Sequence, residues 1–103
     1  MNDKTTWLSY EFNVHLPNVT WSHVEAVYLF CGVKQPENQW IPLYVGKAED
    51  LADRLSNHER WPEAVRLGAT YIHARAVPLA ATRELIEKEL IQAYQPRMNV
   101  QFR

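Results

Sequence analysis

Residues 44–58 read YVGKAEDLADRLSNH, which predicts a short strand that turns at Gly46 into a helix. Acidic residues gather in the first turns of this helix, where they complement the positive end of its dipole. Arg54 and His58 are spaced i, i+4 at the border of the apolar stripe, so we expect their side chains to converge. An arginine in this position either forms a salt bridge or lays its stem along the core while its head reaches water, or it binds a phosphate. The stretch alone does not decide between the two.

The segments on either side predict one small α+β domain. The expected elements, in order, are strands over 8–16, 25–33 and 40–45, a helix beginning near 49, a short helix over 61–68, a strand over 69–77 and a helix over 79–94. The first strand alternates apolar and polar residues, so it either extends the main sheet or lies across the core as a cover. This order is typical of a small sheet with helices packed on its faces.

The composition bounds the class of protein. The chain has 103 residues, 47% of them hydrophobic, which suits one compact core and excludes disorder. Cys31 is the only cysteine, and the four histidines show no paired ligand spacing, so we expect neither an internal disulfide nor a structural zinc. A net charge of −1 argues against coating of nucleic acid by bulk electrostatics. No apolar run could span a membrane, so the expected location is the cytoplasm.

Two of the predicted strands carry motifs that resemble the GIY-YIG nuclease family. Ala26-Val27-Tyr28 matches its first motif, with alanine where the family has glycine, and Tyr44-Val45-Gly46 matches the second. Lys47 follows directly, as in many members, including the excision-repair nuclease. The resemblance implies a three-stranded central sheet, mixed but mainly antiparallel, flanked by helices, with an extra N-terminal strand.

The remaining matches lie on the predicted helices. Arg54 stands at the position of the family arginine, and His58 matches a histidine found in some restriction and homing members. Glu87, followed by Pro96-Arg97-Met98-Asn99, resembles the last motif. The resemblance covers about residues 25–100, which implies a nuclease-like domain over 25–103 and an N-terminal extension over 1–24 that adds a strand.

The resemblance implies a metal-dependent endonuclease that hydrolyses DNA phosphodiester bonds by a tyrosine-assisted attack of water. Glu87 would bind Mg²⁺ or Mn²⁺, for which a carboxylate is a suitable ligand. Tyr28 would be the base, although its role and that of Tyr44 could be exchanged, and His58 would support the base or relay a proton. The expected catalytic set is Tyr28, Tyr44, Lys47, Arg54, His58 and Glu87, and the expected substrate contacts are Lys47, Arg54 and Asn99.

Several alternatives remain open in the sequence. Asn99 is either a brace near Glu87 or a phosphate contact, and Arg83 at i−4 could form a salt bridge with Glu87. His73 is expected on a solvated strand face. The expected partner is duplex or branched DNA, with a protein partner or a homodimer as additions and no membrane. The alternative function is a catalytically inactive module that keeps the fold to bind nucleic acid or a partner.

Overall fold

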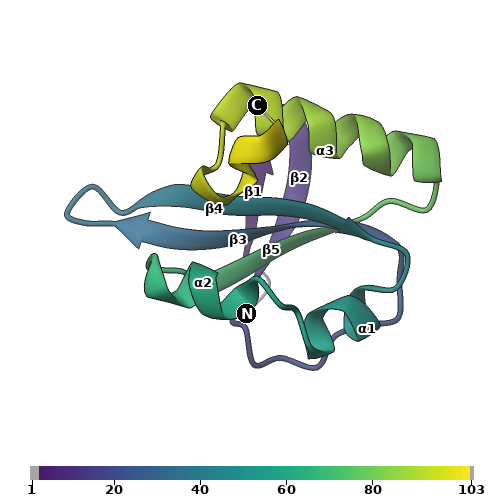
Figure 1. The fold of residues 1–103 in the computed structure, drawn as a ribbon, viewed down its shortest axis with the longest axis horizontal. Coiled ribbons are helices and arrows are strands. Elements are labelled where there is room, and N and C mark those ends of the chain that lie inside the picture. Colours follow the sequence, from purple (N-terminus) through teal and green to yellow (C-terminus); the bar gives the residue numbers. More distant parts are fainter. Residues whose placement is uncertain (1–2, 103) are drawn as a thin grey trace.

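The computed structural model describes residues 3–102 and shows a five-stranded sheet covered by helices (Figure 1). Its elements are β1 (Lys4–Trp7), β2 (Tyr10–His15), β3 (Ala26–Lys34), β4 (Gln39–Ala48), α1 (Leu51–Ser56), α2 (Trp61–Arg66), β5 (Tyr71–Ala76), α3 (Ala80–Tyr94) and the 3₁₀ segment η1 (Arg97–Phe102). The strand order is β1-β2-β5-β3-β4. Within residues 3–102, no helix is long and apolar enough to cross a membrane.

The predicted α+β class is confirmed, but the sheet is larger than three strands. All four strand pairings in it are antiparallel, so the described sheet is not mixed. β3 and β4, which correspond to the strands predicted over 25–33 and 40–45, form a hairpin, and β5 pairs with β3 on the other side. β4 is therefore an edge strand, and both α3 and η1 pack against it.

The N-terminal segment forms a hairpin instead of the single strand predicted over 8–16. Leu8 adopts a φ of 56°, and the chain turns there so that Trp7 pairs with Tyr10. A leucine rarely adopts this left-handed conformation, so the turn has no signal in the sequence. β2 then pairs with β5, so the segment extends the main sheet and does not lie across the core.

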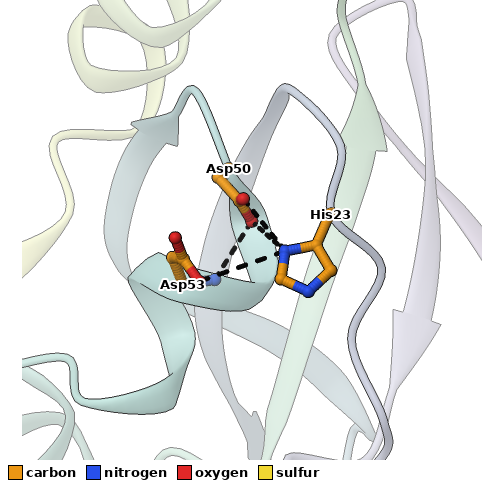
Figure 2. Close-up of side chains that lie close together, drawn as sticks. All are labelled: His23, Asp50 and Asp53. Atoms are coloured by element: carbon orange, nitrogen blue, oxygen red, sulfur yellow. Dashed lines mark hydrogen bonds and ion pairs between the residues drawn. The ribbon is translucent and has the colours of Figure 1, made fainter.

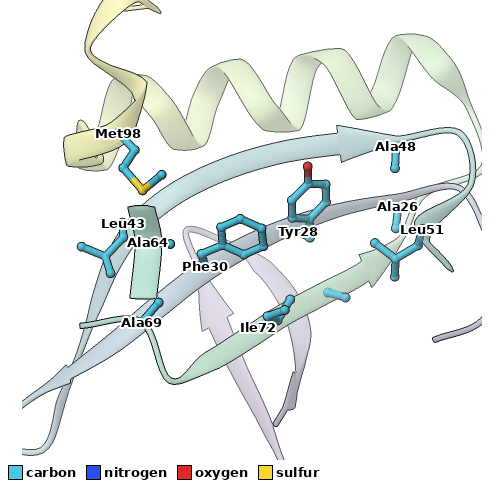
Figure 3. Packing of buried hydrophobic residues seen from close by; sticks show 11 residues of the cluster. Ala26, Tyr28, Phe30, Leu43, Ala48, Leu51, Ala64, Ala69, Ile72 and Met98 are labelled. Carbon is cyan, nitrogen blue, oxygen red and sulfur yellow. The ribbon is translucent and has the colours of Figure 1, made fainter. Parts of the chain in front are cut away.

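The two faces of the sheet are buried by different elements. Side chains alternate along β3, so Tyr28 and Phe30 belong to one apolar cluster and Val27 and Leu29 to the other. Figure 3 shows the first cluster, in which Leu51 of α1, Ala64 of α2 and Met98 of η1 pack over the sheet. The second cluster includes Ile86, Leu90 and Ile91 of α3 and Trp7 of β1. Each large side chain buried in this way contributes roughly 2 kcal/mol to folding.

His73 is fully buried in β5, so the prediction that it is solvated was wrong. The N-terminal hairpin, which the sequence did not reveal, places Trp7 over this strand, and Trp7 Nε1 donates a hydrogen bond of 2.9 Å to His73 Nδ1. Trp40 packs perpendicular to the imidazole, with 4.4 Å between the ring centroids. Burial lowers the pKa of His73 to about 4.

The buried His73 predicts a loss of stability in mild acid. Its folded-state pKa of about 4 lies below the ordinary value of about 6.5, so the unfolded chain binds more protons between these two pH values. The contribution is therefore fully present above pH ~6.5 and is lost as the pH falls towards 4. We expect wild type to lose about 2 kcal/mol more than His73→Gln between pH 7 and pH 4.5 in urea titrations. Equal losses in the two proteins would show that His73 contributes nothing to the acid sensitivity.

Candidate active site at the edge of the sheet

Gly46 gives Tyr28 the space that it needs beside the edge strand. The two residues are paired across β3 and β4, and a Cβ atom at position 46 would lie 2.5 Å from both Cζ and Oη of Tyr28. Figure 3 shows the Tyr28 ring lying against β4 with its hydroxyl directed towards α3. A side chain at position 46 would push the phenol away, so the glycine is required for this placement.

His58 contacts Tyr28 from a loop and not from a helix. α1 ends at Ser56, so the predicted i, i+4 helical spacing of Arg54 and His58 was wrong. His58 Nε2 nevertheless lies 2.7 Å from Tyr28 Oη, and the backbone N–H of Arg60 donates to His58 Nδ1 at 3.1 Å. Burial, aided by the positive charge of Arg54, lowers the pKa of His58 to about 4.

The contacts of His58 fix the direction of its hydrogen bond to Tyr28. A neutral imidazole carries one proton, and Nδ1 is occupied as an acceptor by the Arg60 N–H. The proton therefore lies on Nε2, which donates to Tyr28 Oη. In this state Tyr28 keeps its own proton for another acceptor, and a phenolate at Tyr28 would be stabilised by the donor.

Tyr44 packs beside Tyr28 on the same face of the sheet. Its ring stacks on Phe30, with centroids 5.4 Å apart, and the Arg60 guanidinium lies over it at 5.5 Å. Burial raises the pKa of both tyrosines, the nearby Tyr44 raises that of Tyr28 further, and the charge of Arg54 acts in the opposite direction. Either tyrosine therefore needs additional positive charge nearby to lose a proton near neutral pH.

Glu87 of α3 lies against Lys47 at the same edge. Lys47 Nζ donates to Glu87 Oε1 at 2.9 Å, and both side chains line one surface depression. The predicted salt bridge between Arg83 and Glu87 was wrong, because Arg83 is buried and its guanidinium donates to the carbonyls of Val77 and Pro78. The carboxylate of Glu87 is therefore not paired with Arg83 and contacts the ammonium of Lys47 at the sheet edge.

Arg54 lies on the other side of Lys47. The two residues line a second, more open depression beside the first. Both Nη atoms of Arg54 bind the carboxylate of Glu59, at 2.8 and 3.0 Å. Glu59 and Arg60 were not predicted from the sequence, because their positions depend on the turn after α1 and follow no helical spacing.

Asn99 braces the edge strand. Its Nδ2 donates to the carbonyl of Val45 at 3.0 Å, and the Val45 N–H donates to its Oδ1 at 2.9 Å. The side chain is only 1% exposed. Both ends of the amide thus pair with backbone groups that a neighbouring strand would otherwise satisfy, which favours the brace over the phosphate contact.

A separate group of ligand-type side chains lies at the start of α1 (Figure 2). His23 Nδ1 is 2.9 Å from both carboxylate oxygens of Asp50 and 4.0 Å from Asp53. Asp50 also caps the helix by accepting the backbone N–H of Asp53 at 3.1 Å. The hydrogen bond to Asp50 raises the pKa of His23, so an ion pair and a helix cap account for these contacts.

The comparisons with known proteins point to one family. No family model matches the chain. The chain is 36% identical over 94 residues to the UvrABC system protein C of Dichelobacter nodosus (strain VCS1703A), a match that covers 84% of this chain and only 15% of that protein.

Solved structures agree in fold. The magnesium-bound GIY-YIG N-terminal endonuclease domain of UvrC from Thermotoga maritima matches with a TM-score of 0.60 and 26% identity, covering 76% of this chain and 85% of that chain. A point mutant of the same domain, bound to its catalytic divalent cation, matches with a TM-score of 0.59 and 25% identity, covering 74% and 82%.

Proposed function

The chain belongs to the GIY-YIG nuclease superfamily, and we propose that it is a divalent-metal-dependent endonuclease that hydrolyses DNA phosphodiester bonds. The observation that carries the proposal is that Tyr28, Lys47 and Glu87 lie together at the β4 edge of the sheet. Tyr28 reaches this edge over Gly46, and the Lys47–Glu87 pair lies at the same edge. Hydrolysis of a phosphodiester needs an activated water and positive charge on the phosphate oxygens, and these residue types can supply both.

The donor chemistry of Glu87 suits a hard divalent cation. Its carboxylate is partly buried, with 22% of the side chain exposed, and it lines a depression open to water. Mg²⁺ is commonly bound in this way, through one or two carboxylates with water in the remaining positions. In the structure the ammonium of Lys47 contacts Oε1, which shows that a positive charge is accommodated beside this carboxylate. When bound, the cation would stabilise the charge of the phosphate and of the leaving oxygen.

Tyr28 is the proposed base, and His58 is its proposed support. The Nε2–H of neutral His58 donates to Tyr28 Oη and would stabilise a phenolate there. This contact favours the supporting role of His58 over proton relay, because His58 Nδ1 already accepts the Arg60 N–H. Burial opposes ionisation of Tyr28, so the proposed role depends on a cation bound close by.

Arg54, Lys47 and Tyr44 are the proposed phosphate and water contacts. The planar fork of Arg54 can bind two phosphate oxygens at once, and Lys47 adds a point charge in the same depression. Tyr44 packs between Phe30 and Arg60, which suits a group that positions the water or the phosphate. For Asn99 the contacts support a positioning role through Val45.

A non-catalytic binding module is the second proposed function. Lys47 and Arg54 are both paired with carboxylates, and the net charge of the chain is −1. Neither feature favours tight binding of a polyanion. The chain spans only 15% of its curated relative, so the substrates and assemblies of that larger protein are not carried over. A protein partner, a homodimer and a cytoplasmic location remain proposals.

Incubation with a panel of nucleic acids tests the proposed function. Supercoiled plasmid, linear duplex, branched DNA, single-stranded DNA and RNA are incubated with the protein in Mg²⁺, in Mn²⁺ and in chelator. We expect nicking of at least one DNA substrate that requires the metal. Salt-dependent binding without cleavage under any condition would favour the binding module, and the absence of both would contradict the two proposals.

A further inference from the structure

Glu59 occupies the binding face of Arg54 in the way that a phosphate would. The two Nη atoms of Arg54 meet the two oxygens of the Glu59 carboxylate at 2.8 and 3.0 Å. This two-point arrangement is also the one in which a guanidinium binds two oxygens of a phosphate. The carboxylate and a phosphate therefore cannot both use this face of Arg54.

The backbone around Glu59 holds its carboxylate in reach of Arg54. On one side His58 is tied to Tyr28, and on the other Arg60 donates to the carbonyl of Met98 at 3.1 Å and to Glu63 at 3.1 Å. The Glu59 side chain itself is 66% exposed. It can therefore leave Arg54 by rotating into solvent while the loop stays in place.

The ion pair occupies an arginine that lines the depression proposed to bind phosphate. Arg54 lines this depression together with Lys47 and is only 33% exposed. Lys47 is bound to Glu87, so Lys47 and Arg54, which both line this depression, are each paired with a carboxylate of the same chain. Glu59 belongs to none of the sequence motifs that the site shares with the superfamily.

We propose that Glu59 competes with the phosphate of the nucleic acid for Arg54, so that its carboxylate has to leave before Arg54 binds substrate. The inference rests on the proposed function of Arg54. As a consequence, Glu59 sets the affinity of the site for phosphate. A ligand binds Arg54 only if its interaction with the guanidinium is more favourable than that of the Glu59 carboxylate. A doubly charged or polymeric phosphate meets this condition more readily than a single weak anion.

Binding of a labelled DNA duplex tests this competition. In chelator, where metal-dependent cleavage cannot occur, we expect Glu59→Gln to lower the Kd by about fivefold, a factor typical of one exposed ion pair together with removal of a repelling charge. Glu49→Gln is the matched control, because Glu49 lines the depression together with Arg54 and forms no ion pair within residues 3–102. It removes the same charge and should change the Kd by less than twofold. Thermal melts check that both variants fold.

The dependence on Arg54 separates competition from general electrostatics. In an Arg54→Gln background the effect of Glu59→Gln should disappear, because the competed group is gone. Equal effects of the Glu59 and Glu49 variants, or an effect that persists without Arg54, would overturn the inference.

Titration with inorganic phosphate tests the competition for Arg54 independently of nucleic acid. Failure of every variant to bind nucleic acid would contradict the proposed function, but the phosphate titration would still test the role of Glu59. The Nε–H signal of Arg54 is followed by NMR in wild type and in Glu59→Gln. We expect the signal to shift at about fivefold lower phosphate concentration in the variant. An unchanged signal in both proteins, or the same midpoint in both, would overturn the inference.

Discussion

Replacing Glu87 by Gln is expected to lower the rate of Mg²⁺-dependent DNA cleavage by ~10³-fold or more. The amide has nearly the same size as the carboxylate, but it is neutral and binds a hard cation poorly. A metal that stabilises the charge of the phosphate contributes several kcal/mol to lowering the barrier, and each ~1.4 kcal/mol is a factor of ten in rate. Single-turnover cleavage at saturating Mg²⁺ and at tenfold higher Mg²⁺ measures the loss and shows whether excess metal restores activity.

Glu84→Gln is the matched control for this experiment. Glu84 lies on α3 one turn before Glu87 and lines the same depression. It has no contact with Lys47 among the ion pairs of the described residues. The control removes the same charge and should keep the rate within a fewfold of wild type. Equal losses in the two variants would mean that the charge of the depression matters and that Glu87 has no special role as ligand.

The second large effect is expected from Tyr28→Phe, which should slow cleavage by ~10²–10⁴-fold. The variant keeps the buried ring and removes only the hydroxyl that accepts from His58 Nε2. The change leaves the buried Nε2–H of His58 without its acceptor, which costs about 1–3 kcal/mol of stability, so the variant should remain folded. A large fall in rate together with an intact thermal transition would separate a chemical role from a structural one.

Tyr44→Phe is the comparison that assigns the two tyrosines. If Tyr28 is the base, the Tyr44 variant should lose less activity and should keep the pH dependence of wild type. A larger loss for Tyr44→Phe would exchange the two roles, and full activity of Tyr28→Phe would exclude the proposed mechanism. His58 has a pKa of about 4, so we expect no inflection from it near pH 6.5 in any of these rate profiles.

The fold was predictable where it depends on local pattern. The apolar run of β3, the strand composition of β4 and the period of α3 each gave the right element within a few residues. The N-terminal hairpin was not predictable, because it turns at Leu8 in a conformation that leucine seldom adopts. The burial of His73 follows from the same hairpin and was missed for the same reason.

The residues of the candidate site were proposed from the sequence, but their contacts could not be. The strand and helix motifs point to Tyr28, Arg54 and Glu87 as candidates, because the order of motifs along the chain is visible in the sequence. Their partners lie elsewhere: Glu87 contacts Lys47, 40 residues away, and Arg54 contacts Glu59 across the end of α1. Helical spacing suggested Arg83 for Glu87, but the carbonyls that follow β5 bind Arg83 more closely. Contacts of this kind depend on tertiary packing, which local spacing cannot describe.

The proposed metal-dependent hydrolysis depends on binding of the divalent cation by Glu87. A crystal structure of the protein grown with Mn²⁺, with the ion located by its anomalous scattering, tests this claim most directly. We predict an ion bound by the Glu87 carboxylate, with Lys47 Nζ displaced from Oε1. An ion bound instead at His23, Asp50 and Asp53, with the Lys47–Glu87 pair unchanged at 2.9 Å, would contradict it.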